Sequence, residues 1–415
     1  MNIRKAFHAL NLPVPEGEWV SDDIQCPVES LEAFRACLHE DFIREQSRRI
    51  RLRESLVEPL LHGRKMFDDC PELFDIASAA WHRFCIREPL NKALPSSWQM
   101  IPATVHPAAP MIYIYVYLAI VPTVFQRQSK KNIPEDVTAG TLSDIGVWMQ
   151  DYHDKNGIWG SEHFNWLSGH LTDSLYSLGR LQFNVGTLWL PYRFFRQRYN
   201  GQCIVLAEAG TRFRRDGQFD GVNGVFDDAA WQSVLVEDDQ TVTGTIIHPG
   251  GYAIEKTVTL IKQDWECVAK TEDDILCTHI PASGGLDIEE CGKSLKRTTP
   301  FFNGLYPNKT FRCITCTSWL MDPQLADVHK PTSNLVRWQK GWYLMPNPKA
   351  NDHQIFERVF NCKSDVDVDS LPQDNSLRRA VIEHVKRGGR WRTSSAVIFS
   401  DSINWDDGYR IDGIA

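Results

Sequence analysis

The first part of the chain, to about residue 178, has apolar residues at helical spacing. After Ser30, a residue type that can cap a helix, apolar residues recur at steps of three and four. They are Leu31, Phe34, Leu38 and Phe42. Pro71, shortly after Asp69, stands near the first turn of another predicted helix. These patterns predict an all-helical region of amphipathic helices around one core.

Two further helices are predicted at the end of this region. Thr141 and Asp144 have the spacing of a capping box, and Gly157 ends the helix that follows. A second helix is predicted from Ser161 to Leu178. The connection over Asn156–Gly160 is short, so the two helices should pack antiparallel as a hairpin.

After residue 180 the pattern changes to that of β-strands. Two runs rich in aromatic and β-branched residues, Leu181–Tyr199 and Gln202–Arg214, are separated by Asn200-Gly201, a strong hairpin signal. Further strands are predicted over Trp231–Val236, Thr241–His248, Tyr252–Ile261 and Asp274–Ile280. Successive strands with short turns between them predict an antiparallel meander.

Beyond residue 280, helices and strands alternate. A loop over Pro281–Gly285 leads into a predicted helix, Asp287–Phe302, and a later helix covers Ser376–Lys386. The remaining strands are predicted over Phe311–Leu320, Leu335–Met345, Gln354–Cys362 and Ser394–Phe399. The whole pattern predicts an α+β protein with two domains. A helical domain covers residues 1–178, and a mixed, mostly antiparallel sheet with flanking helices covers residues 179–415.

Composition and charge narrow the class of protein. The 415 residues are 42% hydrophobic and 24% charged, which is typical of a soluble globular chain. A net charge of −8 gives no basic surface for a phosphate backbone, so nucleic acid is excluded as the main partner. Eleven cysteines at irregular spacings, with no visible secretory signal, indicate reduced thiols and a cytoplasmic protein.

One hydrophobic segment must be compared with a membrane-spanning helix. Met111–Val121 is the most hydrophobic run, and Pro110 and Pro122 bracket it. A membrane-spanning helix needs about 20 apolar residues, more than this run contains. A buried helix is therefore predicted here, and no membrane span.

A strand, a small-residue turn and a helix follow one another after Ile275. The turn Ala282-Ser283-Gly284-Gly285 and a helix opening at Asp287 would present backbone N–H groups at the positive end of a helix dipole, where a phosphate can bind. The alternative is a plain turn. In that case Asp287 caps the helix, and the acidic residues Glu289 and Glu290 satisfy the dipole without any ligand.

The predicted helix also carries cations on one face. Lys293, Lys296 and Arg297 are spaced at i, i+3 and i+4 and could meet the phosphates of a nucleotide-bearing cofactor. They could equally be solvated cations near the negative end of the helix. Cys313 and Cys316 form a CxxC, but no second pair stands at zinc spacing, so we expect no metal site.

Several strings resemble a bacterial acyltransferase family with a helical N-acyltransferase N-terminal domain and a GNAT-like C-terminal domain. They are Leu178-Gly179-Arg180-Leu181-Gln182-Phe183, His279-Ile280-Pro281 followed by Gly284-Gly285, the helix Ser294–Phe302, and Cys316-Thr317-Ser318-Trp319-Leu320-Met321-Asp322-Pro323. The resemblance extends from roughly Thr141 to Phe360. It implies a GNAT-like fold for residues 179–415 and a class of reaction, but no particular substrate.

The resemblance also implies acyl-CoA as cosubstrate. In GNAT folds the diphosphate sits on the loop after the fourth strand, at a pattern of Arg or Gln, two residues, Gly, one residue, and Gly or Ala. This pattern falls on His279, Ala282 and Gly284, and only the last position matches. The implied cofactor-binding residues are Ile280, Ala282, Ser283, Gly284, Gly285, Lys293 and Arg297.

Catalysis in such a fold needs a base for the acceptor amine, an acid for the leaving thiolate and a backbone N–H for the thioester carbonyl. His279 is the candidate base because imidazole titrates near neutral pH, although a packed structural histidine would fit the same position. Cys316 and Ser318 could protonate the thiolate or orient the substrate.

The predicted activity is acyl-CoA-dependent transfer to a small amine acceptor by direct attack. The alternative is a non-catalytic module that senses acyl-CoA or binds a protein. The altered residues His279 and Ala282, with the acidic residues after them, keep that alternative open.

Overall fold

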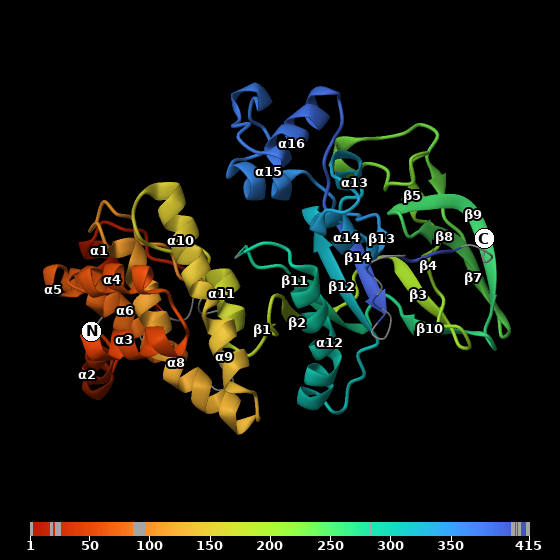
Figure 1. The fold of residues 1–415 in the computed structure, drawn as a ribbon. Helices are drawn as coiled ribbons and strands as arrows, with labels where there is room; N and C mark the ends of the chain where they lie inside the picture. The colour runs from red at the N-terminus through yellow and green to blue at the C-terminus, as the bar shows by residue number, and fades with distance from the viewer. Residues whose placement is uncertain are drawn as a thin grey trace. The chain divides into compact units, whose positions relative to one another are not determined.

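The computed structural model of the chain describes residues 3–16, 20, 26–85, 97–282, 284–399, 403, 405 and 408–411. The chain forms two compact units, residues 1–182 with 280–284 and residues 183–279 with 285–415. In Figure 1 the helices of the first unit run from red to yellow, and most of the second unit runs from green to blue.

The first unit is built from α-helices, as the apolar spacing predicts. They are α1 (Ile3–Ala9), α2 (Val28–Ala36), α3 (Glu40–Arg49), α4 (Glu54–Gly63), α5 (Met66–Asp69), α6 (Pro71–Cys85), α8 (Ile112–Lys130), α9 (Glu135–Leu142), α10 (Asp144–Asn156) and α11 (Phe164–Leu171). A short 3-10 helix, η2 (Ala109–Met111), precedes α8, and the two-residue strand β1 (Tyr176–Ser177) follows α11. One hydrophobic core connects these helices.

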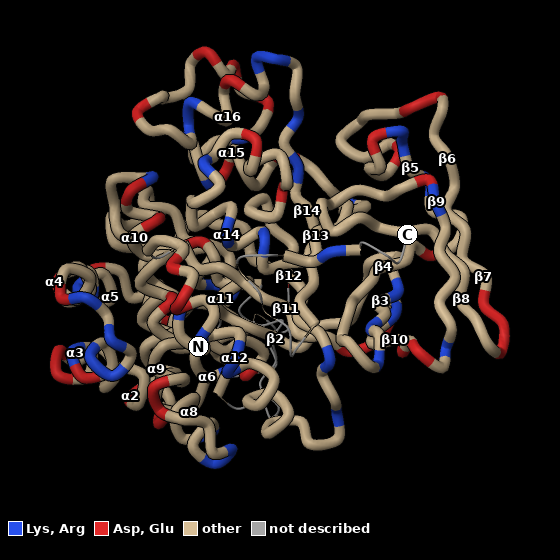
Figure 2. The backbone as a smooth tube through the Cα atoms, turned by 45° about the vertical axis from the view of Figure 1, so that its right-hand side comes forward, with Lys and Arg blue, Asp and Glu red and all other residues tan. Residues whose placement is uncertain are grey.

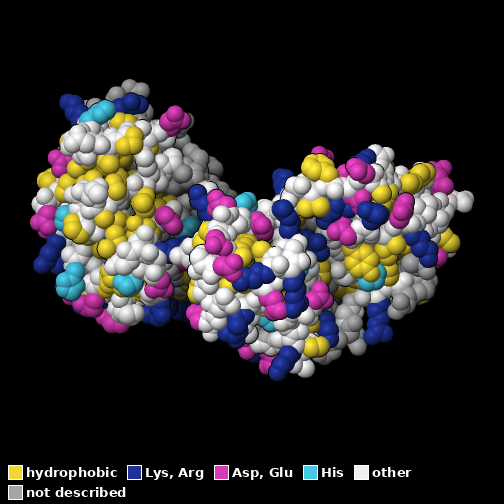
Figure 3. Space-filling view, turned by 90° about the horizontal axis from the view of Figure 1, so that it is seen from above, with side chains coloured by type: hydrophobic (Ala, Val, Ile, Leu, Met, Phe, Trp, Pro, Cys, Tyr) yellow, Lys and Arg dark blue, Asp and Glu magenta, His cyan; other side chains and the backbone are white. Residues whose placement is uncertain are grey.

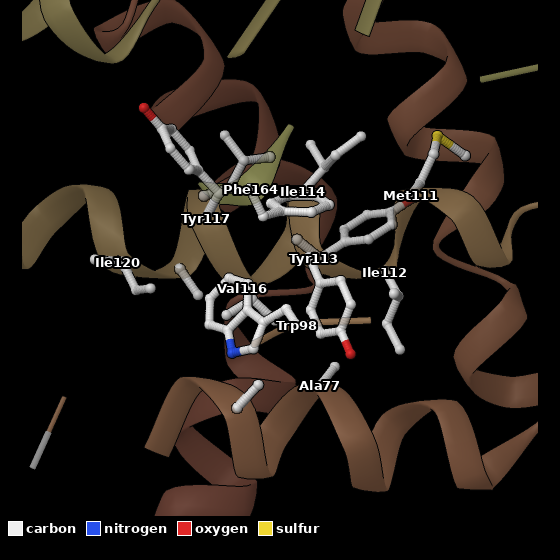
Figure 4. Close-up of a cluster of buried hydrophobic side chains, with 14 of the residues drawn as sticks. Ala77, Trp98, Met111, Ile112, Tyr113, Ile114, Val116, Tyr117, Ile120 and Phe164 are labelled. Carbon is white, nitrogen blue, oxygen red and sulfur yellow. The ribbon is translucent and has the colours of Figure 1, made fainter. Parts of the chain in front are cut away.

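α8 is the central helix of this core. Every residue from Ile112 to Val121 is buried. Figure 4 shows Trp98 stacked on Tyr113, with Phe164 of α11 against the same tyrosine ring; the ring centroids lie 4.9 and 5.3 Å apart. Stacked and edge-on aromatic contacts add to the free energy of burying these large side chains.

α8 is also the one helix of the described chain that is long and apolar enough to cross a membrane. Its most apolar stretch has a mean hydropathy of 1.5, but 83% of that stretch is buried inside the structure. The prediction of a buried helix is confirmed. The helix is longer than the predicted run, because it continues through Pro122 to Lys130.

Two predicted helix starts are wrong. The helix predicted after Ser30 is two helices, α2 and α3, and Ser30 lies inside α2 with its hydroxyl 2.9 Å from Nδ1 of His82. Thr141 and Asp144 form no capping box. The Thr141 hydroxyl donates to the carbonyl of Val137 within α9, and Asp144 is the first residue of α10. Gly157 ends α10 with φ of 70°, as predicted.

The predicted helix Ser161–Leu178 is also wrong, because α11 ends at Leu171. The hydroxyl of Thr172 donates back to the carbonyl of Ser168, and Asp173 has φ of 55°, which an α-helix cannot continue. Gly179 caps no helix. It has φ of 98° in the turn between β1 and β2, where Leu178 N bonds Leu181 O.

Asp173 is held by the end of α8. Its carboxylate accepts hydrogen bonds from Arg127, Gln128 and Lys131 at 2.7–2.8 Å, and it is buried. Burial raises the pKa of this carboxyl, but the hydrogen bonds from Arg127 and Lys131 outweigh burial and leave the pKa below its usual range. The charged carboxylate therefore fixes the turn that ends α11.

We predict that Asp173→Asn lowers the free energy of unfolding at neutral pH by about 1.5–3 kcal/mol, the usual contribution of hydrogen bonds to a charged group. Asn fits a positive φ, so the loss reflects the charge. Because the carboxyl pKa is lower in the folded state, its stabilisation exists above the unfolded pKa and is lost as pH falls through the folded pKa. Melting temperatures measured from pH 7 to 3 should therefore converge below about pH 4.

The control for this experiment is Asp154→Asn, which changes a carboxylate that is 66% exposed in the same unit. This variant should melt close to the wild-type temperature throughout. A difference in melting temperature between wild type and Asp173→Asn that stays constant with pH would show that the charge of Asp173 does not hold the turn.

The second unit contains β2 to β14. The strands are β2 (Gln182–Thr187), β3 (Tyr192–Gln197), β4 (Cys203–Ala207), β5 (Arg212–Phe213), β6 (Trp231–Gln232), β7 (Leu235–Glu237), β8 (Thr241–His248), β9 (Tyr252–Ile261), β10 (Trp265–Ala269), β11 (Asp274–His279), β12 (Cys313–Ser318), β13 (Tyr343–Met345) and β14 (Ser394–Phe399). One sheet here has the order β2-β11-β12-β14-β13, and a second has the order β10-β3-β4-β8-β7 with β9 also on β8. Strands β5 and β6 form a separate pair.

The first of these sheets is mixed, as predicted. β11 and β12 are parallel, whereas β12 with β14 and β13 with β14 are antiparallel. A parallel pair needs a crossover, and α12 (Ile288–Leu305) supplies it. Together with the helical first unit, this arrangement confirms the predicted α+β fold class.

The two faces of this sheet have different neighbours. Residues on one face join the hydrophobic core shared with the second sheet, which contains Phe194 and Val205. They are Ile275, Cys313, Tyr343, Val397 and Phe399. Because side chains alternate along a strand, Thr278, Cys316 and Ser394 point to the other face, where the crossover helix α12 is placed. Figures 1 and 2 both show α12 running beside this sheet.

Several strand predictions are wrong. The predicted strand Leu335–Met345 is the helix α14 (Asn334–Lys340), which Ser333 caps, followed by the short β13. Gln354–Cys362 is covered by the helix α15 (His353–Phe360). Its buried residues Ile355, Phe356, Val359 and Phe360 have the spacing of a helix face, which an aromatic and β-branched composition obscured. Three predicted runs are each divided between two sheets. Leu181–Tyr199 forms β2 and β3, Gln202–Arg214 forms β4 and β5, and Trp231–Val236 lies over β6 and β7.

The predictions for the last helix and the last strand are confirmed. The helix α16 (Ser376–Lys386) and the strand β14 have the predicted bounds. α15 and α16 pack around a small separate core, which also includes Leu325, a residue that precedes β13 in the chain. Elsewhere α13 (Leu325–Val328) and the 3-10 helices η3 (Val222–Gly224), η4 (Trp319–Met321) and η5 (Val368–Ser370) are short connections.

Charges of both signs alternate along the surface. On α3 and α4, for example, Arg44 contacts Glu40, Glu54 and Glu58 at 2.9–3.1 Å. Figure 3 shows acidic and basic side chains interspersed over the face in view. This mixture agrees with the net negative charge and offers no continuous basic surface on that face.

Candidate active site

The pairing of β11 with β12 stops before either strand ends. The parallel register joins Leu276 to Ile314 and ends at Thr278 with Cys316. On its other side β12 stays paired with β14 as far as Ser318. The ladder between β11 and β12 therefore ends short of their carboxyl ends. This end of the ladder, where the loop that leads to α12 begins, is called the wedge.

Asn184 of β2 lies beside His279 of β11. The distance from Asn184 Oδ1 to His279 Nε2 is 2.7 Å. Further along, the N–H of Leu188 donates to the carbonyl of Asp273, so β2 and β11 run antiparallel. His279 and Asn184 are both half-buried. His279 is thus held at the end of its strand, next to the wedge.

His279 and the other two candidate catalytic residues are on opposite faces of the sheet. His279 follows Ile275 and Cys277 in the alternation and shares their face. Cys316 is in register with Thr278, and Ser318 lies two residues further on, so both point to the α12 face. The three residues predicted to act together flank the wedge from two sides.

On the face of His279 the end of the sheet is polar. The exposed Thr317 of β12 and the buried Ser395 of β14 are paired in register, and their hydroxyls lie 3.0 Å apart. With Asn184 and His279 they make a row of polar side chains on this face. An amine acceptor could hydrogen-bond there.

On the α12 face the side chains are buried. Burial raises the pKa of the Cys316 thiol far above its usual value. A thiol this weakly acidic is a poor donor for a leaving thiolate, which disfavours the predicted acid role of Cys316. The Ser318 hydroxyl accepts from Leu320 N and so starts the 3-10 helix η4.

Two other hydroxyls on this face have no hydrogen-bond partner within the described chain. They are Thr278 Oγ1 and Ser394 Oγ, and both are buried. Thr278 is in register with Cys316, and Ser394 with Ser318. Buried hydroxyls usually find a partner, so these two are able to serve a ligand in the wedge. Sequence patterns gave no signal for them, because Ser and Thr occur throughout the chain.

The loop after β11 is open. Ala282, Gly284 and Gly285 are exposed and Ile280 is half-buried, whereas Ser283 lies outside the described residues. A Cβ built on Gly284 or Gly285 would meet no atom within 4 Å, but Gly284 has φ of 75°, which favours glycine. The space beside the Cα atoms of Gly284 and Gly285 is therefore open.

A cation that sequence reasoning missed touches the loop. Arg180 Nη2 donates to the carbonyl of Gly284 at 3.3 Å. Arg180 lies far from Gly284 in the sequence, so spacing alone could not bring the two residues together. It adds positive charge to the loop.

The start of α12 matches the plain-turn interpretation in one respect. Asp287 is the N-cap, and its carboxylate accepts from Glu290 N at 3.0 Å. Lys293 pairs with Glu290 at 2.6 Å, and both side chains are exposed. The hydrogen bond with Glu290 raises the pKa of Lys293. Arg297 is exposed one turn later on the same helix.

His170 of the first unit is fully buried. His170 Nε2 lies 3.4 Å from Asp144 Oδ2, which also accepts from the indole N–H groups of Trp148 and Trp166. Burial raises the pKa of Asp144, but the contacts with His170 and the indoles outweigh it and leave the pKa below its usual range. Sequence reasoning assigned Asp144 to a helix cap and did not find this cluster.

Metal ligands are not grouped in the described part of the chain. No set of three His, Cys, Asp or Glu side chains that could hold a metal ion occurs there. Cys313 and Cys316 point to opposite faces of β12, so they cannot chelate one ion together.

Two family models match the chain. The model of the GNAT-like C-terminal domain matches residues 175–398. The chain belongs to this family. The model of the N-acyltransferase N-terminal domain matches residues 41–172. The predicted resemblance to acyltransferases with these two domains is therefore confirmed.

Solved structures of acyltransferases share the fold. One, in complex with decanoyl-CoA and teicoplanin, has a TM-score of 0.61 and 23% identity over 96% of this chain and 99% of its own. Another, a variant in complex with octanoyl-CoA, has a TM-score of 0.60 with the same identity and coverage. A third, with CoA and 10C-teicoplanin, has a TM-score of 0.60 and 22% identity. None of the curated proteins compared with the chain matches it.

The GNAT-like unit packs tightly beside His279. A Cβ built on Gly186 of β2 would lie 2.6 Å from Cys277 Sγ, closer than real Cβ atoms come. We predict that Gly186→Ala lowers the free energy of unfolding by about 1–3 kcal/mol, as overpacking does. Chemical denaturation of the purified variant measures this loss.

The double variant Gly186→Ala, Cys277→Ala tests the cause. Removing the sulfur should restore most of the lost stability, because the two changes share one contact. Additive losses in the double variant would contradict this packing of β2 on β11.

Proposed function

We propose that the protein transfers an acyl group, other than an aminoacyl group, from an acyl-CoA thioester to a small amine-bearing acceptor by direct attack. The observation that carries this proposal is the wedge, where the β11–β12 ladder ends at Thr278 and Cys316, one residue before β11 itself ends. The acyltransferase domains of the family and the CoA esters bound by the fold's solved relatives support it.

The wedge suits the pantetheine arm of CoA. An extended ligand can add to a strand through backbone hydrogen bonds where strand pairing has ended. Thr278 Oγ1 and Ser394 Oγ lie on the α12 face of the same sheet and can bond polar atoms of this arm or of the thioester. The thioester would then lie near the ends of β11 and β12.

The diphosphate of CoA is proposed to bind the loop over Ala282–Gly285. Backbone N–H groups and the positive end of α12 favour an anion there. Arg180, which bonds the Gly284 carbonyl, adds charge, and Lys293 or Arg297 would do so from α12. Lys293 must exchange its contact with Glu290 for the phosphate, whereas Arg180 already contacts the loop itself.

The chemistry needs few groups. His279 would accept a proton from the acceptor amine, whose nitrogen forms the new bond to the acyl carbon. The carbon–sulfur bond then breaks, and the CoA thiolate leaves and takes up a proton. A backbone N–H at the wedge would stabilise the developing oxyanion. The products are an amide and CoA, so atoms and charge balance without a metal.

We also propose a cytoplasmic location. All eleven cysteines are free thiols, which supports a reducing compartment.

We predict that CoA and acyl-CoA esters bind the wild-type protein and that Gly285→Val weakens this binding by roughly tenfold, as a clash of 1–3 kcal/mol would. Gly285 has space for a side chain in the protein, so the loss would come from the diphosphate losing its close approach. Calorimetric titration measures the affinity.

Gly304→Val, which adds the same side chain to another glycine with open surroundings, is the control and should bind normally. Unchanged affinity in a folded Gly285→Val protein would place the diphosphate elsewhere. Tight binding of acyl-CoA with no transfer to any of a panel of amines would favour the non-catalytic sensing module instead.

We predict that His279→Ala lowers turnover by about 10²–10⁴-fold while CoA affinity is kept, because a general base contributes that much. The variant should also lose the neutral limb of the pH–rate profile. Turnover and melting temperature are measured on the same preparation.

His353→Ala, which removes an exposed histidine of α15, is the control for this variant. A destabilised His279→Ala protein with normal turnover per folded molecule would mean that His279 is structural.

A further inference from the structure

We infer that the acyl group of the donor carries a hydroxyl or another hydrogen-bonding substituent, and that Ser394 of β14 binds this substituent. The inference rests on the proposed function, because it names the class of acyl-CoA that the protein would use. A short 3-hydroxyacyl-CoA is the simplest member of this class.

The α12 face of the sheet changes from large to small side chains toward the wedge. Away from the wedge, the register aligns three buried side chains, Leu276, Ile314 and Ile398, across neighbouring strands. The next two rows contain only small side chains. They are Thr278, Cys316 and Ala396, followed by Ser318 and Ser394. We call these five residues the small-residue patch.

Two hydroxyls of the small-residue patch are buried without a hydrogen-bond partner in the described part of the chain. They are Thr278 Oγ1 and Ser394 Oγ, and the two residues are 3% and 1% exposed. Covering a hydroxyl without pairing it is unfavourable, and an apolar side chain of the same size would avoid this cost. The small-residue patch is therefore suited to a ligand that has polar atoms of its own.

The two hydroxyls lie on different sides of β12. Thr278 ends the ladder of β11 with β12, so it borders the wedge in which the pantetheine arm is proposed to lie. Ser394 is paired with Ser318 on the other side of β12. Because neighbouring strands are about 4.8 Å apart, β14 lies roughly 10 Å from β11. We therefore assign Thr278 to the arm or the thioester, and Ser394 to the acyl group that extends over β12.

The side chains between these hydroxyls suit a short carbon chain. Cys316 and Ala396 are small and apolar, and both are buried. A saturated acyl chain over them would cover Ser394 Oγ and leave it unpaired. A hydroxyl on the third carbon would pair with it, and a site built to bond a hydroxyl rejects the analogue without one.

The test compares two esters of the same chain length. Calorimetric titration of the wild-type protein measures the Kd of CoA, butyryl-CoA and 3-hydroxybutyryl-CoA, the last in both configurations. We expect one configuration of 3-hydroxybutyryl-CoA to bind about 10- to 100-fold more tightly than butyryl-CoA, because it pairs a buried hydroxyl that butyryl-CoA leaves unpaired. This measurement needs no acceptor.

Three variants locate the effect. Ser394→Ala should bind the two esters with equal affinity and CoA with wild-type affinity, because it removes only the hydroxyl. Thr278→Val has the same shape as the wild type and should weaken both esters alike, so the preference remains. The control is Ser47→Ala, which removes another buried hydroxyl without a partner, from α3 of the first unit, and should leave all affinities unchanged.

Two results would overturn the inference. One is a wild-type protein that binds the two esters equally or binds butyryl-CoA more tightly. The other is a Ser394→Ala protein that loses as much affinity for CoA as for 3-hydroxybutyryl-CoA, because Ser394 would then bind the arm. The proposed function fails separately. A protein that prefers 3-hydroxybutyryl-CoA but acylates no amine of a panel keeps the assignment of Ser394 and contradicts the transfer.

Discussion

The site depends on one constraint, which is that β12 must pair with two different neighbours over different lengths. Its antiparallel pairing with β14 extends to Ser318, whereas its parallel pairing with β11 ends at Thr278 and Cys316. The antiparallel ladder thus continues two residues beyond the end of the parallel one. A wedge between two strands is therefore supported by the continuous edge of the same sheet rather than by a flexible loop.

This wedge separates two chemical environments. On the face toward the second sheet, His279, Asn184 and Thr317 are half-buried or exposed, so a polar acceptor can reach them. On the α12 face, Cys316 and Ser394 are buried, which suits the apolar and thioester part of a CoA ester. In the proposed reaction the acceptor would approach the thioester from the face of His279, and direct transfer requires that the amine nitrogen be held close to the acyl carbon.

The parts of this arrangement that the sequence predicts are those with a local cause. Asn200-Gly201 gives the turn between β3 and β4, and Asp287 caps α12, because both signals act within a few residues. The early end of α11 escaped prediction because Asp173 is fixed by Arg127, which is distant in sequence. α15 was read as a strand because its side chains suit strands, although their spacing is helical. Local signals are therefore reliable here where no tertiary contact overrides them.

The residues of the candidate site also fall into two groups, those that a local sequence pattern indicates and those that it does not. His279 and the glycine loop are recognisable because they stand in a strand–loop–helix order along the chain. Asn184 and Arg180 are not, because each meets its partner across many residues, and nothing in the local sequence marks either residue. That His279 and Cys316 point to opposite faces follows only from the register of β11 on β12.

The order of strands in this sheet has a consequence for how the protein is made. β14 lies between β12 and β13 in space but follows both in the chain, after the separate small core of α15 and α16. While the chain emerges from the ribosome, β12 and β13 therefore lack their shared neighbour, β14, until residues 394–399 are synthesised. Uncovered strand edges are prone to aggregate. The nascent protein should accordingly need chaperone protection late in its synthesis, even after its helical unit has folded.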